Sequence, residues 1–448
     1  MRPWQWMAVC GMTAAVAAGL TTELAAQEVP ALVDKQLPGL LAIYKGVHTA
    51  PELSHHEAQT SALLADELRR AGYTVTEHVG KYPDGSQAYG VVGILKNGGG
   101  PTLLVRADID ALPVTEDTKL PYASKVRAKN PAGQEVGVMH ACGHDVHITT
   151  MIGVARNMAA LKSQWHGTLM LIGQPSEETI DGAKAMLADH LYERFGKPDM
   201  AIALHDANFA AGKVSVVSGP ALASSTSIDV VMRGVGTHGA APEAGKDPIV
   251  MAAEFVVELQ TVVSRSTPPS QPAVVTVGDI HGGTKRNIIS DEVKMELTAR
   301  CYSEEVRQTI IEGVKRTAKG VAIAAGVPEN RMPIVTVLDD ESTPATINDP
   351  ALAARLQKIF VAKFGAVNVI EKQPIMGSED FGIFSLDHKI PAVIFWLGAY
   401  DPAKVAESER TGVALPSPHS PFFAPLPEPT LRTGVTAMTD AALALLQS

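Results

Sequence analysis

The sequence has few cysteines, no cluster of basic residues and, beyond its first 26 residues, no long apolar run. Its 448 residues include three cysteines, and 38 Lys and Arg against 48 Asp and Glu give a formal net charge of -10 at pH 7. A protein that neutralises nucleic-acid phosphates needs grouped Lys and Arg. We therefore expect no nucleic-acid partner.

The long apolar run lies near the N-terminus, at residues 7–20. It follows the basic residue Arg2 and precedes small residues ending at Ala26, which is the pattern of a secretory signal peptide. The run is short for a membrane span, which needs about 20 apolar residues, although an uncleaved anchor is the alternative. We expect residues 1–26 to be removed, leaving an exported protein, periplasmic or secreted, with no membrane attachment.

Of the three cysteines, Cys10 would leave with the signal peptide, so that Cys142 and Cys301 remain. A disulfide between them is possible in an oxidising compartment. However, Cys142 lies among histidines in a string typical of metal ligands, whereas Cys301 ends the strand-like segment VKMELTARC and resembles a buried small hydrophobe. Two free cysteines are therefore the favoured interpretation.

The length predicts two domains. Up to about Val217, strand-like and helix-like segments alternate, which indicates an α/β sheet with helical cover. The next segment, to about Leu338, has the order β-α-β-β-α-β of a ferredoxin-like fold. We therefore expect a mixed-sheet α/β domain built from residues 27–221 and 339–448, with an α+β domain of residues 222–338 inserted into it.

The segment MHACGHDVH, residues 139–147, is the most informative string in the chain. It brings Cys142 and His144 together with further histidines at the start of a predicted helix. Thiolate and imidazole are the ligands that zinc and similar divalent metals prefer. The segment predicts half of a metal site, and a polar helix entrance is the alternative.

Two other strings carry paired carboxylates directly after strand-like runs. Asp108 and Asp110 could ligate a metal or hold a ligand histidine in its working tautomer, or they could cap a helix or turn. Glu177 and Glu178 would repel each other unless a cation is near or one is protonated. One could bind metal while its neighbour takes a proton from water, and a solvated loop pair is the alternative.

Two single histidines complete the candidate ligands. His205 ends the strand-like segment MAIAL, and His419 lies in the Pro-rich loop SPHSPFF. A lone histidine is more often structural than a ligand. Counted with Cys142, His144 and Glu178, however, they supply nitrogen, oxygen and sulfur donors for two metal ions with positions left open. A structural zinc needs only a closed set of four, so the set predicts a catalytic site.

The predicted inserted domain carries polar residues of its own. His238 stands between glycines in GVGTHGAAP, where a flexible turn would let it donate to a developing oxyanion, although the glycines could serve turn geometry alone. Asn287 and Arg300 could bind a carboxylate, since Arg offers a bidentate fork. Alternatively, Arg300 is simply solvated at a strand end.

Together these residues resemble the co-catalytic metallopeptidase and amidohydrolase family that includes carboxypeptidase G, aminoacylase, hippurate hydrolase and plant auxin-conjugate hydrolases. The resemblance is closest to its N-acyl-amino-acid amidohydrolase branch. It covers nearly everything after the signal peptide, because HACGHDVH, QPSEE, GVGTHGAAPEAGKDP, GSEDF and PHSPFF occur in the expected order. It implies a metallopeptidase-type catalytic domain with an inserted lid that serves many members as a dimerisation surface, so we expect a homodimer.

The resemblance also implies a role for each motif residue. Two divalent ions, of zinc, manganese, cobalt or nickel, would be held by Cys142 as the bridging ligand and by His144, Glu178, His205 and His419. Glu177 would be the general base, and Asp110 would have a supporting role. The residues expected to meet the substrate are His238, which could reach across a dimer, Asn287, Arg300 and, in GSEDF, Gly377.

The expected reaction is metal-dependent hydrolysis of the amide bond of N-acyl amino acids or related small amides. The loop QPSEETIDGA lacks the Gly-rich run of typical members, and PEAGKDP lacks a histidine that many carry after that proline. Both departures bear on substrate preference and leave the chemistry intact. The alternatives are a metallo-carboxypeptidase or dipeptidase of the same family, a cysteine hydrolase with Cys142 as nucleophile, and a secreted binding protein without catalysis.

Overall fold

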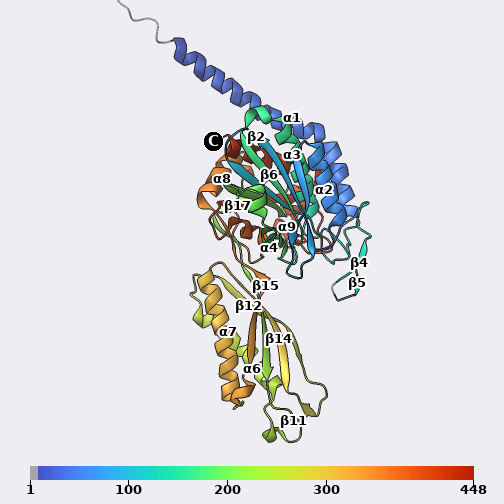
Figure 1. Ribbon diagram of the computed structural model, residues 1–448, viewed down its shortest axis with the longest axis vertical. Helices are drawn as coiled ribbons and strands as arrows, with labels where there is room; N and C mark the ends of the chain where they lie inside the picture. Colours follow the sequence, from blue (N-terminus) through green and yellow to red (C-terminus); the bar gives the residue numbers. More distant parts are fainter. Residues whose placement is uncertain (1–8, 131, 448) are drawn as a thin grey trace, which may run out of the picture.

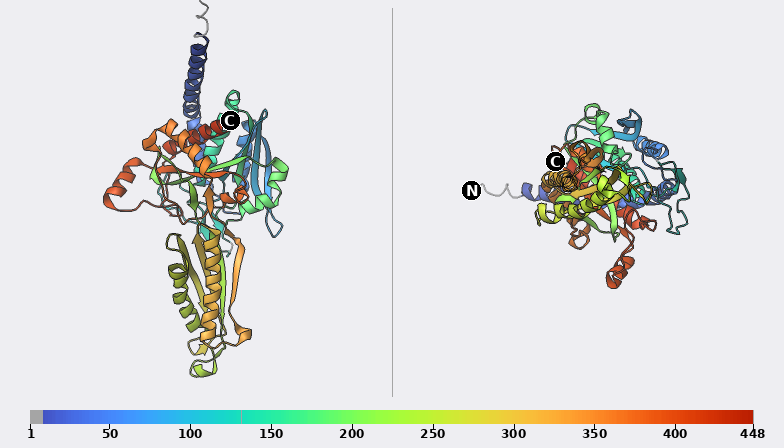
Figure 2. Two further views of the ribbon diagram at one scale, coloured as in Figure 1. Left: turned by 90° about the vertical axis from the view of Figure 1, so that its left-hand side faces the viewer. Right: turned by 90° about the horizontal axis from the view of Figure 1, so that it is seen from below.

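The protein has two parts that lie end to end (Figure 1). The computed structural model describes residues 9–130 and 132–447. An α/β part with a large sheet contains segments from both ends of the chain, and a smaller part from the middle of the chain projects from it (Figure 2). The predicted fold class is therefore confirmed, while the exact domain boundaries stay a prediction.

The main sheet has seven strands in the order β1-β2-β6-β3-β7-β17-β8. Its central strands β6, β3, β7 and β17 run parallel, and the pairs β1-β2, β2-β6 and β17-β8 are antiparallel. The strands are β1 (Thr74–Lys81), β2 (Gln87–Asn97), β3 (Thr102–Asp108), β6 (Gly167–Gln174), β7 (Met200–Ala210), β8 (Val214–Val216) and β17 (Ala392–Tyr400).

Helices cover both faces of this sheet, so successive side chains of the central strands enter different cores. Leu103 and Val105 of β3 join the core on one face, whereas Leu104 joins the core on the other. The first face is covered by α1 (Val9–Thr49), α2 (Ala58–Arg70), α3 (His144–Ala160), α8 (Pro350–Phe364) and α10 (Pro427–Leu446). The second is covered by α4 (Gly182–Ala188), α5 (Leu191–Phe195) and the 3-10 helix η6 (Asp380–Ser385).

The smaller part is the predicted β-α-β-β-α-β unit. Its antiparallel sheet has the order β12-β14-β10-β15, and its helices pack on that sheet through one apolar core. Asp247 and Ser303 cap the two helices by accepting hydrogen bonds from first-turn N–H groups. The elements are β10 (Ser225–Arg233), α6 (Pro248–Thr261), β12 (Ala273–Gly282), β14 (Glu292–Cys301), α7 (Glu304–Ala324) and β15 (Ile334–Thr343).

Short elements fill the connections. The small strands are β4 (Arg127–Lys129), β5 (Glu135–Gly137), β9 (Gly219–Leu222), β11 (Thr237–His238), β13 (Ile288–Ile289) and β16 (Thr346–Asn348). The short helical turns are η1 (Lys162–Gln164), η2 (Pro242–Ala244), η3 (Val262–Ser266), η4 (Glu329–Arg331) and η5 (Ala366–Asn368), and one further exposed helix is α9 (Pro402–Thr411).

The helix α1 was not among the predicted elements. Pro30 and Pro38 lie inside it, and proline removes a helical hydrogen bond. Its described side chains nevertheless form one apolar face at helical spacing, which packs against α3 and α10. The face consists of Val29, Val33, Leu37, Leu40, Tyr44 and Val47. Tertiary packing thus outweighs the local cost of the prolines.

The N-terminal prediction is addressed only in part. Residues 1–8 of the expected signal peptide lie outside the described residues, and α1 continues from Val9 across the expected cleavage point. Among the residues that the structure describes, no helix has the length and apolarity that a membrane crossing requires. Cys142 and Cys301 are both free and buried, as predicted.

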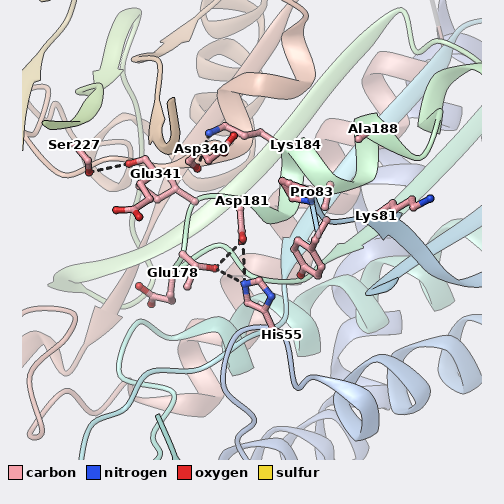
Figure 3. Close-up of a pocket in the computed structure, with 14 residues that line it drawn as sticks. His55, Lys81, Pro83, Glu178, Asp181, Lys184, Ala188, Ser227, Asp340 and Glu341 are labelled. Atoms are coloured by element: carbon pink, nitrogen blue, oxygen red, sulfur yellow. Dashed lines mark hydrogen bonds and ion pairs between the residues drawn. The ribbon is translucent and has the colours of Figure 1, made fainter. Parts of the chain in front are cut away.

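Lys184 of α4 makes a hydrogen-bonded contact between the α/β part and the smaller part. The Lys184 ammonium donates to the carbonyl oxygens of Asp339, Asp340 and Ser342 at 2.7, 3.0 and 2.6 Å, at the end of β15. Figure 3 shows Lys184 beside this turn, over a cavity that both parts line. Because α4 follows the QPSEE loop directly, this clamp ties the orientation of the smaller part to the segment that carries Glu177 and Glu178.

Candidate functional site

Three candidate segments meet at one edge of the main sheet. Strands β3 and β6 are parallel, and Asp108 at the end of β3 is the register partner of Gln174 at the end of β6. The carboxyl ends of parallel strands therefore place the RADIDALP and QPSEE strings side by side, as open α/β sheets do with their ligand sites. Helix α3 begins at His144 beside them.

The five predicted metal ligands converge there in two groups that share Cys142. The ligand atoms of Cys142, His144 and His205 lie within 4.8 Å of one another, and the same holds for Cys142, Glu178 and His419. Cys142 Sγ is 3.4 Å from His205 Nε2, and His419 Nε2 is 3.4 Å from Glu178 Oε2. Cys142 is common to both groups, so it lies where it could bridge two ions, and His144 also groups with Asp108 and His147 and with Glu177 and Glu178.

Hydrogen bonds to backbone carbonyls orient two of these histidines. His144 Nδ1 is 2.9 Å from the Asp110 carbonyl oxygen, and His205 Nδ1 is 2.7 Å from the Asp206 carbonyl oxygen. Since a carbonyl only accepts, each Nδ1 carries a proton, so that in the neutral form of either histidine the lone pair lies on Nε2, where a metal can bind. His144 Nε2 is buried without a hydrogen-bond partner among the described residues.

The paired aspartates act on the ligand segments and do not cap a helix. Asp110 Oδ2 accepts hydrogen bonds from the Glu178 N–H at 3.0 Å and from Ser54 Oγ at 2.7 Å. Asp108 Oδ1 lies 2.5 Å from Nδ1 of His147, whose Nε2 accepts from the Asp206 N–H at 3.0 Å. Asp110 therefore has the supporting position expected from the sequence, and His147 is a positioning residue with both nitrogens engaged.

Asp206 is a site residue that the sequence analysis missed. It directly follows His205 in β7, which continues past His205 to Ala210 instead of ending there as predicted, because its pairing with β17 extends that far. Both carboxylate oxygens of Asp206 are buried without a hydrogen-bond partner among the described residues. The only sequence signal was an acid next to a candidate ligand in LHD.

A buried guanidinium supports the floor of the site. Arg106 of β3 donates to Gln174 Oε1 at 2.8 Å, to Asp108 Oδ2 at 2.6 Å and to Glu379 Oε1 at 2.7 Å, and it lies 3.2 Å from Asp380 Oδ1. The SEDF string is therefore tied to β3 and β6 through one cation. Such buried carboxylates are tolerated because each has a charged or hydrogen-bonding partner.

A second buried charged group fixes the start of α3. His48 at the end of α1 lies 2.6 Å from Asp145 Oδ2 and 3.1 Å from Glu116 Oε1. Burial alone would lower the pKa of His48, but hydrogen bonds to both carboxylates raise it to about 10. The resulting imidazolium holds Asp145, which is the residue next to the candidate ligand His144.

The pKa values at the site reflect the crowding of carboxylates in a buried place. Burial, followed by the charges of Glu379 and Glu178, raises the pKa of Glu177 well above its usual range, and burial raises the pKa of Glu178 to about 8. Burial lowers the pKa of His205 to about 4, so this imidazole is neutral at neutral pH. Burial also raises the pKa of the Cys142 thiol. Divalent cations would reverse these effects on the acids, since their charge favours the ionised forms.

Four of the candidate ligands, Cys142, Glu178, His205 and His419, line a cavity of about 660 Å³ that also holds two predicted substrate residues, Arg300 and Gly377. Arg300 Nη1 donates to Ser378 Oγ at 2.6 Å, so this residue is not merely solvated. Glu178 and Ile180 also line a second cavity of about 650 Å³ on the other side of their loop. There His55 pairs with Asp181 at 3.1 Å (Figure 3).

His238 and Asn287 do not join this cavity within one chain. His238 is exposed on β11, at the end of the smaller part that lies farthest from the main sheet (Figure 1). The neighbouring Asn287 accepts a hydrogen bond from the Gly239 N–H through its carbonyl at 2.9 Å. Within one chain, His238 and Asn287 therefore do not reach the cavity. A role of His238 in the site of a partner chain stays a prediction.

Comparison with known proteins gives consistent matches. Residues 104–441 match the model of peptidase family M20/M25/M40. The chain is 36% identical over 341 residues to hippurate hydrolase of Campylobacter jejuni, covering 75% of this chain and 82% of that protein. It is 36% identical over 370 residues to N-acetyldiaminopimelate deacetylase of Leuconostoc citreum, covering 82% and 89%. A dinuclear metal-binding M20 peptidase of Bacillus subtilis superposes with a TM-score of 0.73 at 26% identity, covering 92% of this chain and 99% of that one.

The turn before α3 yields a testable prediction. Gly143 has φ 81°, and a Cβ there would stand 2.3 Å from each carboxylate oxygen of Asp206. Gly412 has a similar φ of 73° with nothing within 4 Å of the corresponding Cβ. We expect Gly412→Ala to lower the free energy of unfolding by about 1 kcal/mol, and Gly143→Ala to lower it by roughly 3 kcal/mol or more because of the added clash.

Chemical denaturation of both variants measures the difference. Equal losses of stability in the two variants would show that Asp206 does not constrain the backbone at Gly143.

Proposed function

Because the chain belongs to peptidase family M20/M25/M40, we propose that it is an amidohydrolase that splits N-acyl amino acids or related small amides into a carboxylic acid and an amino acid. Two relatives, named hippurate hydrolase and N-acetyldiaminopimelate deacetylase, support this class of reaction. The observation that carries the proposal is the convergence of two ligand groups on Cys142 beside Glu177.

The donor set fits two divalent ions. It combines sulfur, imidazole nitrogen and carboxylate oxygen, which suits zinc, manganese, cobalt or nickel, and buried His144 Nε2 and Glu178 Oε1 have no hydrogen-bond partner among the described residues. We assign the ions to Cys142, His144, Glu178, His205 and His419. When bound, such ions lower the pKa of a water molecule and polarise the amide carbonyl.

Glu177 is the general base of the proposed reaction. It lines the cavity, and its Oε2 lies 3.8 Å from His144 Nε2, so its carboxylate stands next to the ligand groups. It takes the proton of the attacking water and delivers it to the amide nitrogen as the carbon–nitrogen bond breaks. Arg300 and Gly377 face the substrate in the same cavity, where the guanidinium can hold a carboxylate in a bidentate manner.

The cysteine-hydrolase alternative fits the site less well. A nucleophilic cysteine needs a lowered pKa, whereas burial and the neighbouring glutamates raise the pKa of Cys142. A peptidase acting on dipeptides would use the same groups as the proposed amidohydrolase. A substrate panel that includes both N-acyl amino acids and dipeptides distinguishes these two.

We propose further that the smaller part is a lid through which two chains form a homodimer. Its edge strand β12 pairs on one side only, with β14. Apolar side chains exposed on this part include Ile249, Val250, Val257, Val274, Ile280 and Ile288. An unpaired edge beside exposed apolar side chains is a surface that association would cover. In such a dimer His238 of each chain would stabilise the oxyanion in the site of its partner.

The first prediction from this proposal concerns the base. Glu177→Gln should retain both metal ions, because Glu177 is not among the assigned ligands, while kcat for N-acyl amino acids falls by about 10²- to 10⁴-fold. Metal content by mass spectrometry and turnover of the loaded protein are measured together. Near-normal turnover with metals bound would assign the base elsewhere.

The second prediction concerns His238. A mixed dimer of one Glu177→Gln chain and one His238→Ala chain, isolated through two different tags, should recover about half of the wild-type activity, because one site combines an intact Glu177 with the partner's intact histidine. Each variant alone should be nearly inactive. A mixed dimer as inactive as its parents would place His238 in its own chain's site, and failure to isolate any mixed dimer would refute the dimer.

The third prediction concerns export. We propose that residues 1–26 direct the chain out of the cytoplasm and are removed. The mass of the protein recovered from the exported fraction should correspond to a chain that begins near Gln27. Recovery of the full-length chain in the membrane fraction would instead indicate an uncleaved anchor.

A further inference from the structure

Lys372 is a second cation in the ligand-lined cavity that nothing in the proposed reaction uses. It lines the cavity together with Arg300, and both side chains are half-buried. No Asp or Glu of the described chain lies within ion-pair distance of either one. Instead, Arg300 donates a hydrogen bond to Ser378 Oγ, and the Lys372 ammonium lies 4.6 Å from the centre of the Phe209 ring. The cavity thus holds two cations without a carboxylate partner.

Burial of these cations has a cost that a ligand can offset. Burial lowers the pKa of both Lys372 and Arg300, as happens when a cation loses water without gaining an anion. Of the acids that line the cavity, Glu178 is an assigned metal ligand, and Glu177 and Asp206 lie beside the assigned ligands, where bound ions would offset their charge. The counter-charge for Lys372 and Arg300 is therefore expected from the substrate.

The segment that carries Lys372 is held in place at both ends. Ile370 donates its N–H to the Val214 carbonyl at 2.9 Å, and Ile375 donates to the Ala221 carbonyl at 3.1 Å. Ala223 donates in return to the carbonyls of Ile375 and Gly377. Together with the cation–π contact to Phe209, these bonds fix the ammonium group on the cavity wall and distinguish it from a lysine that moves freely in solvent.

We propose that Lys372 selects substrates whose amino-acid half carries a second carboxylate, so that the preferred substrates are N-acyl derivatives of acidic amino acids. This inference rests on the proposed amidohydrolase function and names the substrate class for the same cavity. Arg300 offers the planar fork that suits the α-carboxylate, and Lys372 offers a point charge that suits a side-chain carboxylate. The apolar side chains of Leu222 and Trp396 in the same lining would contact the intervening methylene groups.

The test compares the hydrolysis of N-acetylglutamate with that of its neutral isostere N-acetylglutamine by the metal-loaded mature protein. The wild type should favour the glutamate substrate in kcat/KM by at least about 10-fold, because the site holds an otherwise unpaired charge. Lys372→Met should reduce this ratio to about one, and Lys372→Arg should keep most of it. The matched control is Lys319→Met, since Lys319 is an exposed lysine on α7 and its loss should leave the ratio unchanged.

Binding provides a readout independent of turnover. Calorimetry with the Glu177→Gln protein should show tighter binding of N-acetylglutamate than of N-acetylglutamine, and the additional Lys372→Met replacement should remove the difference. Hydrolysis of neutral N-acyl amino acids with no preference for acidic ones, or a preference that survives Lys372→Met, would overturn this inference while the amidohydrolase proposal stands. Absence of turnover with every N-acyl amino acid would overturn both.

Discussion

The concentration of buried carboxylates at one edge of the main sheet is the constraint on which the site depends. Arg106 neutralises part of this charge through Asp108, Glu379 and Asp380. Glu178 and Asp206 are left with buried oxygens that have no hydrogen-bond partner among the described residues. Buried carboxylate oxygens of this kind favour a nearby cation, so the same folding that brings the strand ends together creates a place that suits metal ions.

Much of the site could be predicted because strand ends carry the motifs. Once β3 and β6 are recognised as parallel neighbours, Asp108 and the two glutamates must lie at one edge, and the short spacing of Cys142 and His144 adds a third contribution. The bond between Arg106 and Glu379 could not be predicted in this way. It joins residues 273 positions apart, and the sequence around either residue contains no pattern that indicates its partner.

Other features depend on tertiary packing, which local sequence patterns do not indicate. The helix α1 contains two prolines that argue against it, yet α3 and α10 bury its apolar face. Asp206 stands beside a predicted ligand, but its orientation toward the turn at Gly143 follows from the extended pairing of β7 with β17. The placement of His238 far from the cavity follows from how the smaller part projects from the α/β part, at the contact where Lys184 binds three carbonyl oxygens.

Two levels of organisation thus combine in one site. The parallel strands and α3 fix the groups that would hold ions and move a proton, while the loop carrying Lys372 and Arg300 of the smaller part line the space for substrate. The first set is recognisable from short strings, whereas the second is spread over segments that meet only in the folded chain. The type of reaction was therefore easier to predict from the sequence than the preferred substrate.

The central claim is that five dispersed side chains hold two divalent ions, with Cys142 shared between them. Anomalous X-ray diffraction from crystals of the metal-loaded protein tests it most directly. The account predicts two peaks of anomalous density, both within bonding distance of Cys142 Sγ, with Glu177 outside both coordination spheres. Loaded crystals that show no ordered metal at these residues, or a single ion with a closed set of four ligands, would contradict it.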